Sequence, residues 1–397
     1  MDDLSPSCRT KASSASRATI AEITPKPSGG SRTPRSALCE THGRIVMNVR
    51  PDISTIKSVT MPENFPQAAR PIDLVVLVLP GFSQLALHAF IEPFRIANTV
   101  SKLSLFRWRI AGVDERSVEG ASGLSVGVDV TIDEMISCLG ARRPQHVAVI
   151  AGEPVGRRLT PQLNSFLRTI ARHGVGVSAV GTATWLLAQT GLLEGTRCTI
   201  HWSRLAAFTE VFRQPHIRDA LFVKDGQFST CAGELASFDL AVDIIASHVG
   251  GYTAQEVCRY ATVEGQRSGS NRQTGPTGLA FGGVSDKLQM AMRIMEENVE
   301  YPLTMSEVAR RAGVSRRQLE RLFAAHVHIP PVRHYLRIRV DHAKRLIEGT
   351  SMPIIDIAMA CGFLSPSHFA KCFRTFNGLS PQQCRLTTPA WVGPGLG

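Results

Sequence analysis

The chain has 397 residues, of which 43% are hydrophobic and 19% are charged. This length predicts two or three domains, and this composition is typical of a globular protein. Its sequence contains no apolar run of membrane-spanning length, and the N-terminus, with Asp2 and Asp3, lacks the features of a secretory signal. We therefore expect a cytoplasmic protein without a membrane partner. The net charge of +11 favours a polyanionic partner.

The cysteines and the charge distribution narrow the class further. Nine cysteines are scattered without a C-x-x-C pair or a paired Cys/His spacing, which argues against a zinc site and against a disulfide framework. We expect neither a metal nor a cofactor. Residues 71–283 carry 19 Lys or Arg against 18 Asp or Glu, whereas residues 284–397 carry 15 against 9. The C-terminal segment is thus the better candidate for contact with a polyanion.

The two ends of the chain are expected to be tails. Residues 1–65 are rich in Ser, Thr, Pro and Arg and lack an apolar periodicity, so we expect a disordered segment. Non-specific contact with DNA, a solvated extension, and a true start at Met47 or Met61 remain alternatives for it. Residues 389–397 form a second, short tail.

The centre of the chain has the rhythm of an α/β domain. Residues 72–81, IDLVVLVLPG, form a β-branched apolar run that ends in Pro-Gly and predicts a buried parallel strand. Alternation with helical segments predicts an open parallel sheet with helices on both faces over residues 66–265. Residues 266–283 are rich in Gly, Ser and Thr and are typical of a linker. The further strands are expected at 106–113, 146–153 and 174–181.

The C-terminal segment, residues 284–388, is expected to be all α-helical. Thr304 can cap a short helix, and Glu307 stands where it would complete a capping box. Gly313 suits the left-handed conformation that ends a helix, and Ser315 can cap a second helix. This spacing is typical of a helix-turn-helix unit.

A second unit follows about 49 residues later, with a turn glycine at Gly362 and a cap at Ser365. A connecting helix over 335–348 is expected to place the two second helices about one DNA turn apart, roughly 34 Å. Arg and Gln are well suited to paired hydrogen bonds with base edges. The candidate DNA-binding residues are Arg316, Arg317, Gln318, Arg321, Ser365, Ser367, His368, Lys371 and Arg374.

The stretch ACGFLSPSHFAKCFRTFNGLSP, within residues 284–385, closely resembles the AraC/XylS-type DNA-binding domain. Two departures concern local packing: Cys384 replaces a usual Tyr, and residues 328–331, HIPP, replace a usual Gly-x-Ser-Pro. The resemblance implies a transcription regulator, expected to be an activator, with double-stranded promoter DNA and RNA polymerase as partners.

Two stretches of the α/β segment, VLPGFSQLALHAFIEPFRIAN and SAVGTATWLLAQTGLLEGTRCTIHW, resemble the class-I glutamine-amidotransferase-like domain of the PfpI type. This resemblance implies a flavodoxin-like sheet and, in catalytic members, a Cys at a strand-to-helix elbow. By alignment, Gly181 takes that place, so we predict no catalytic residue and no enzyme. Cys198 and His201 are expected to be structural.

A crevice at the carboxyl ends of the strands is the usual ligand position in such a sheet. The resemblance implies a small nitrogen-containing effector: an amine, an amino acid or a quaternary ammonium compound. Backbone N–H groups at the elbow could hold a carboxylate, and Glu92, matched to an acidic residue beside the elbow, could hold a cation. The candidate ligand-binding residues are Phe82, Glu92, Gly181, Thr182, Ala183 and Trp202, with Glu234 as a further candidate. For Glu92 and the aromatic residues, an ordinary structural role is the alternative.

These patterns together predict an effector-controlled, homodimeric DNA-binding regulator. One rival is an amidotransferase-superfamily enzyme with an appended DNA-binding domain, and Gly181 speaks against it. The other rival is a ligand-independent architectural protein, which would have no use for a large, nearly neutral α/β domain.

Overall fold

The computed structural model describes residues 70–153, 159–273 and 286–387, all of which belong to one unit, Pro66–Gly397. The expected tails at 1–65 and 389–397 lie outside these residues. Within the described ranges, none of the helices has the length and apolar character needed to cross a membrane.

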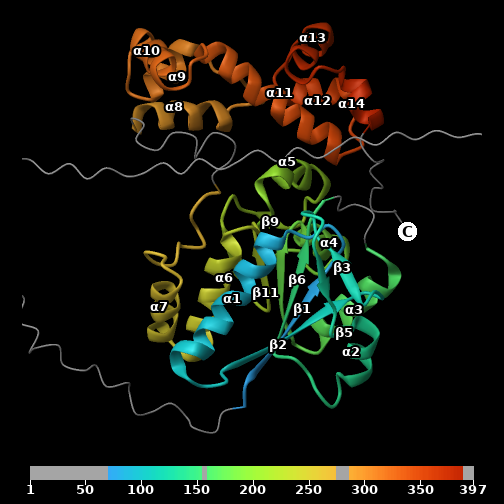
Figure 1. Ribbon diagram of the computed structural model, residues 1–397. Coiled ribbons are helices and arrows are strands. Elements are labelled where there is room, and N and C mark those ends of the chain that lie inside the picture. The colour runs from blue at the N-terminus through green and yellow to red at the C-terminus, as the bar shows by residue number, and fades with distance from the viewer. Residues whose placement is uncertain (1–69, 154–158, 274–285, 388–397) are drawn as a thin grey trace, which may run out of the picture. The chain divides into compact units, whose positions relative to one another are not determined.

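A seven-stranded sheet forms the centre of the α/β domain (Figure 1). Its strand order is β10-β11-β7-β6-β1-β2-β5, and every neighbouring pair is parallel except β10 with β11. The five central strands β2-β1-β6-β7-β11 have the order of a flavodoxin-like sheet, which confirms the expected fold class. The strands are β1 (Ile72–Val78), β2 (Phe106–Gly112), β5 (Val130–Thr131), β6 (His146–Ala151), β7 (Gly176–Gly181), β10 (Phe222–Asp225) and β11 (Phe228–Cys231). Two small pairs accompany them: β3 (Ser117–Glu119) with β4 (Ser125–Gly127), and β8 (Arg197–Cys198) with β9 (His216–Ile217).

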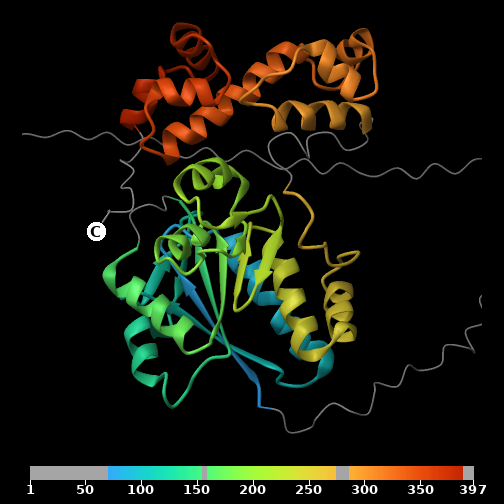
Figure 2. The ribbon, with the colours of Figure 1, turned by 180° about the vertical axis from the view of Figure 1, so that it is seen from behind.

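Helices cover both faces of the sheet because successive side chains of a strand point to opposite sides. Leu74, Val76 and Val78 of β1 pack into one core, together with one group of helices, whereas Val75 and Leu77 pack into the other. Figure 2 shows the two groups on either side of the sheet. The first group is α1 (Gln84–Ser101), α6 (Ala236–Val249) and α7 (Gly251–Tyr260), and the second is α2 (Ile132–Cys138), α3 (Pro161–Arg172), α4 (Ala183–Gln189) and α5 (Trp202–Val211).

The segment after α7 stays on the α/β domain beyond the point where the sequence predicted a linker. Phe222 of β10 donates its backbone N–H to the carbonyl oxygen of Gly269 at 3.2 Å. Arg267 donates to the buried carboxylate of Asp239 at 2.6 and 2.9 Å. Residues 266–273 are therefore fastened to the domain, and composition missed this because these contacts leave no periodic pattern. The remaining part of the expected linker, 274–283, lies outside the described residues.

The C-terminal domain is helical, as predicted, and contains two helix-turn-helix units joined by α11. Helix α11 has 19 residues and is about 28 Å long. It begins at Pro331, four residues before the predicted start, because Pro is well suited to the first position of a helix. Leu319 and Phe323 occupy the core of the first unit, and Phe369 and Phe373 that of the second. The helices are α8 (Asp286–Glu297), α9 (Met305–Arg311), α10 (Arg316–His326), α11 (Pro331–Gly349), α12 (Ile354–Ala360), α13 (Pro366–Asn377) and α14 (Pro381–Thr387).

Candidate DNA interface and ligand crevice

The first recognition helix, α10, begins in a reciprocal capping box. The Ser315 hydroxyl accepts the backbone N–H of Gln318 at 3.2 Å, and the Gln318 side-chain oxygen accepts the backbone N–H of Ser315 at 2.8 Å. Gly313, in the turn before it, has the predicted left-handed conformation with φ +68°. Gln318 therefore fixes the start of the helix. The sequence had predicted a contact of Gln318 with a base but not this capping role.

The capping box predicted for α9 forms only in part. Thr304 caps the helix as expected, because its hydroxyl accepts the backbone N–H of Glu307 at 3.3 Å. The Glu307 carboxylate instead accepts from Arg310 and Arg311, and these hydrogen bonds lower its pKa to about 2. Two arginines on this helix thus share one carboxylate, which offsets one of their two positive charges.

All nine candidate DNA-binding residues are exposed, but they differ in what they already bind. Gln318 is held in its capping box, and the Arg316 side chain pairs with Glu320 at 3.1 Å. The Nε2 atom of His368 lies 3.3 Å from the Sγ atom of Cys372. Among the nine candidates, the cations that form no ion pair within the described part of the chain are Arg317, Arg321, Lys371 and Arg374.

The second recognition helix, α13, is built in the same way. Its turn glycine, Gly362, has φ +71°, and a Cβ atom there would lie 2.8 Å from the carbonyl oxygen of Val299. Only glycine avoids both penalties. Ser365 caps the helix by accepting the backbone N–H of His368 at 3.4 Å, and Ser367 stays exposed in the first turn. The N-terminal residues of a recognition helix are those that contact base edges.

Arg339 positions the second unit, although no sequence pattern predicted this role. Its guanidinium group donates to the carbonyl oxygens of Cys361 at 2.9 Å and Gly362 at 2.7 Å. The same group lies 4.2 Å from the centre of the Phe363 ring. Arg339 therefore ties α11 to the turn before α13 from inside the protein. An Arg that donates to backbone carbonyls inside a fold leaves no separate signal in a single sequence.

In the α/β domain, Gly181 lies at a strand-to-helix elbow, as the resemblance implied. It ends β7 with φ +72°, and α4 begins two residues later at Ala183. A Cβ atom at Gly181 would lie 2.8 Å from the carbonyl oxygen of Ala151 on β6. Thr182 donates its N–H to the same oxygen at 3.2 Å and its hydroxyl to the carbonyl oxygen of Gly152 at 2.8 Å. The elbow therefore has no side chain that could act as a nucleophile, and little room for one.

Segments from two other parts of the domain contact this elbow. His201 donates its backbone N–H to the carbonyl oxygen of Gly181 at 3.4 Å. A Cβ atom built on Gly233 would lie 2.8 Å from the Cα atom of Gly181, so these two backbones are in close contact. The next residue, Glu234, is exposed and accepts the hydroxyl of Ser83 at 2.7 Å. Glu234 therefore places an exposed carboxylate at the carboxyl ends of the strands.

The titratable groups near the elbow are not arranged for covalent catalysis. Burial raises the pKa of both Cys198 and Cys231 to about 12, so their thiols stay protonated. Burial also lowers the pKa of His201, against the opposing effect of the carboxylates of Glu234 and Glu153. Among the described residues, no cluster of His, Cys, Asp or Glu is arranged to hold a metal ion.

Several candidate ligand residues lie elsewhere or are covered. Glu92 pairs with Arg95 at 2.7 Å on the half-exposed side of α1, eight residues beyond the start of that helix. The prediction from the motif left out the stretch of α1 that separates Glu92 from the end of the preceding strand. Phe82 is fully buried in the core, so its ring has a structural role. Thr182 and Ala183 are also buried, and the N–H of Thr182 is already donated.

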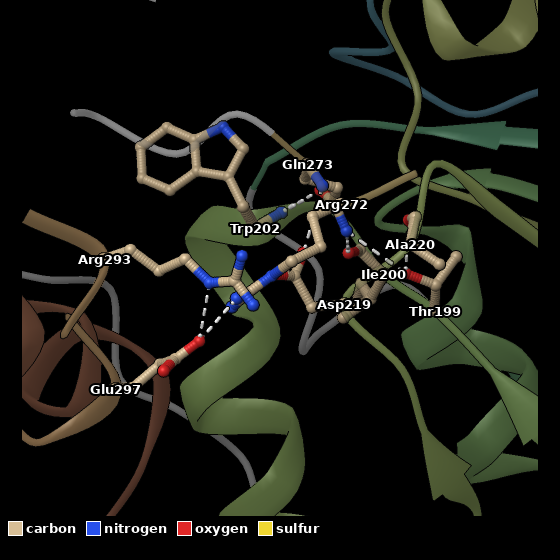
Figure 3. Close-up of polar contacts among 9 residues, drawn as sticks. All are labelled: Thr199, Ile200, Trp202, Asp219, Ala220, Arg272, Gln273, Arg293 and Glu297. Carbon is tan, nitrogen blue, oxygen red and sulfur yellow. Dashed lines mark hydrogen bonds and ion pairs between the residues drawn. The ribbon is translucent and has the colours of Figure 1, made fainter. Parts of the chain in front are cut away.

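Trp202 begins α5, and its backbone is bound by Gln273, at the C-terminal end of the described α/β domain. The Gln273 side-chain oxygen accepts the backbone N–H of Trp202 at 2.7 Å (Figure 3). Its amide nitrogen donates to the hydroxyl of Thr199 at 3.1 Å and to the carbonyl oxygen of Ile200 at 2.8 Å. One side chain thus satisfies three groups of the segment that contains His201, although the sequence gave no signal for it.

The neighbouring residue, Arg272, extends this contact to the helical domain. Its guanidinium group donates to Asp219 and to Glu297, each at 2.7 Å, and Glu297 also accepts from Arg293 at 3.0 Å (Figure 3). Glu297 is the last residue of α8. Because these side chains are about half exposed, each ion pair contributes only about 0 to 1 kcal/mol.

The fold and the two sites define a DNA-binding regulator with an α/β sensor-type domain, and comparisons with known proteins agree. A family model described as a helix-turn-helix domain matches residues 308–387, and the DJ-1/PfpI family model matches residues 74–247. The HTH-type transcriptional regulator GbdR of Pseudomonas aeruginosa strain UCBPP-PA14 is 35% identical over 326 residues, which cover 82% of this chain and 87% of GbdR. The HTH-type transcriptional regulator GlxA of Rhizobium meliloti is 31% identical over 311 residues, which cover 78% of this chain and 94% of GlxA.

A crystal structure of an AraC family transcriptional regulator from Pseudomonas putida covers 48% of this chain and 100% of its own, at 20% identity and a TM-score of 0.44. On the strength of the full-length relatives, the chain belongs to the AraC-type transcriptional regulators that carry a DJ-1/PfpI-like N-terminal domain. It is a DNA-binding regulator and not an enzyme, as the sequence predicted.

Proposed function

We propose that this regulator is an activator controlled by a small, positively charged nitrogen compound that binds beside the elbow at Gly181. The effector class comprises amines, amino acids and quaternary ammonium compounds. We further propose that the protein acts as a homodimer on double-stranded promoter DNA, with RNA polymerase as its partner.

The effector proposal rests on the environment of the Glu234 carboxylate. Its carboxylate is exposed at the strand ends, binds the Ser83 hydroxyl, and has no Lys or Arg partner in the described chain. The neighbouring carboxylate of Glu153, in contrast, forms an ion pair with Arg204, whose guanidinium nitrogen lies 2.6 Å from the Oε2 atom of Glu153. A cation that binds next to Glu234 gains Coulomb energy without displacing an existing ion pair.

A thermal-shift screen of the full-length protein against amines, amino acids and quaternary ammonium compounds tests this proposal. A true effector at a hundredfold excess over its dissociation constant stabilises the protein by about 2.7 kcal/mol. Glu234→Gln removes the charge while keeping the shape, and we expect at least a tenfold loss of affinity. Glu210→Gln on α5 is the matched control, because it removes an exposed carboxylate elsewhere in the same domain. Equal affinity for both variants would place the effector elsewhere.

The route from the elbow to the DNA-binding domain is proposed to run through Gln273. Segment 199–202 contacts the elbow through His201 and is held by Gln273, and the adjacent Arg272 pairs with Glu297 of α8. An effector that shifts His201 also moves the groups of segment 199–202 to which Gln273 is hydrogen-bonded. A ligand can change the regulator only by binding one of its states more tightly.

A further inference from the structure

Leu364 is exceptional among the apolar residues of the helical domain. Its side chain is fully exposed, at 102% of the reference area, whereas its neighbour Phe363 is buried at 2%. Leu364 directly precedes Ser365, the residue that caps the recognition helix α13. A large apolar side chain thus stands in water at the end of the helix that is expected to face the bases.

The first unit shows that the fold does not require this residue. Val314 donates its backbone N–H to the carbonyl oxygen of Ala309 at 3.0 Å, and Phe363 donates in the same way to Ala358 at 2.9 Å. Val314 and Phe363 therefore occupy equivalent positions, and both pack against the core of their own unit. In the first unit the cap follows Val314 at once, whereas in the second unit Leu364 is inserted between them.

We propose that Leu364 is a sequence-reading residue of the second unit, and that its side chain contacts the C5-methyl group of a thymine in the major groove. The inference rests on the proposed base contacts of α13. The methyl group is the one apolar feature that base pairs present in that groove, and apolar side chains read it. Ser367, His368 and Lys371, all exposed, follow within the next two turns and supply polar contacts to the neighbouring bases.

The size of the effect follows from the area that one methyl group buries. Removing one buried methyl group costs about 0.8 kcal/mol, which corresponds to about a fourfold change in the dissociation constant. Leu364→Ala removes more apolar area than one methyl group, so its effect on a cognate duplex should be at least as large. No change in folding is expected, because the side chain contacts nothing in the described chain.

The test uses the full-length protein and a duplex that it selects from a randomised library. Each thymine of that duplex is replaced in turn by deoxyuridine, which lacks only the C5-methyl group, and dissociation constants are measured by fluorescence anisotropy. Leu386→Ala is the matched control, because Leu386 is also an exposed leucine, at 77%, and belongs to α14 and not to a recognition helix.

We expect one thymine whose replacement weakens binding by the wild type about fourfold and leaves Leu364→Ala unaffected. On the unmodified duplex, Leu364→Ala should bind at least fourfold more weakly than the wild type, and Leu386→Ala should bind equally well. The proposal is wrong if Leu364→Ala binds the unmodified duplex with full affinity, or if it responds to every replacement as the wild type does. A lowered melting temperature of Leu364→Ala would also overturn it by showing a structural role. If no duplex is enriched at all, base readout by α13 fails first, and Leu364 fails with it.

Discussion

The elbow at Gly181 should tolerate no side chain, even though it holds no nucleophile. Replacing Gly181 by Ala forces an L-residue into the left-handed region, which costs about 1 to 2 kcal/mol. The new Cβ atom also lies 2.8 Å from the carbonyl oxygen of Ala151, which cannot move freely because Thr182 donates to it. Such overpacking costs a further 1 to 3 kcal/mol or so. We expect a total loss of about 2 to 5 kcal/mol.

Gly123→Ala separates the two contributions. Gly123 has a similar φ of +79° and no atom within 4 Å of the position of a Cβ, so its substitution carries only the conformational cost. Urea unfolding followed by tryptophan fluorescence reports mainly on the α/β domain, which contains Trp108, Trp185 and Trp202. Equal losses of stability in the two variants would show that the elbow is not sterically closed and would refute this reasoning.

Further predictions concern DNA binding, signal transmission and pH. The affinity of the full chain for DNA should fall steeply with salt, because its cations displace counterions from phosphates, and a flat salt response would contradict the DNA interface. Arg317→Ala should weaken one half-site by about 1 to 3 kcal/mol, whereas Gln318→Ala should in addition lower thermal stability by about 1 kcal/mol through its lost cap. Gln273→Ala should keep effector affinity but reduce the effector-dependent change in DNA affinity, and an unchanged response would exclude this route. Burial, with a smaller contribution from His248, lowers the pKa of His146 to about 4, below the 6.5 of an exposed imidazole. Between pH 6.5 and 4 the unfolded state binds a proton that the folded state does not, so the free energy of unfolding should fall by about 3 kcal/mol over this range. Denaturation curves of the wild type and of His146→Gln at both ends of the range measure this loss, which should be absent from the variant.

The sequence predicted the parts of the structure that depend on periodicity and on backbone geometry. Alternating side chains of β1 enter two separate cores, so its continuous apolar run predicted a strand covered on both faces. Gly313 and Gly362 both have the positive φ angles that their turn positions predicted. Gly181 was placed at the elbow by its alignment with a known motif, and its φ of +72° agrees.

Contacts between distant side chains could not be predicted in the same way. Glu92 was assigned to the crevice from its motif, but the rise along α1 carries it away from the strand end. Glu234 approaches Ser83 across 151 residues of sequence, and Gln273 reaches Thr199 across 74. Gln318 illustrates a different difficulty, because one residue type at one helix position is suited to both capping and base recognition.

The most direct test of effector control is the affinity of the full-length protein for its selected duplex, measured by fluorescence anisotropy with and without an effector found by the thermal-shift screen. We expect the effector to change the DNA affinity of the wild type and of Glu210→Gln. Glu234→Gln should bind DNA equally well but should no longer respond at the same effector concentration. An effector response of Glu234→Gln at the wild-type concentration would contradict the proposed effector site beside Glu234.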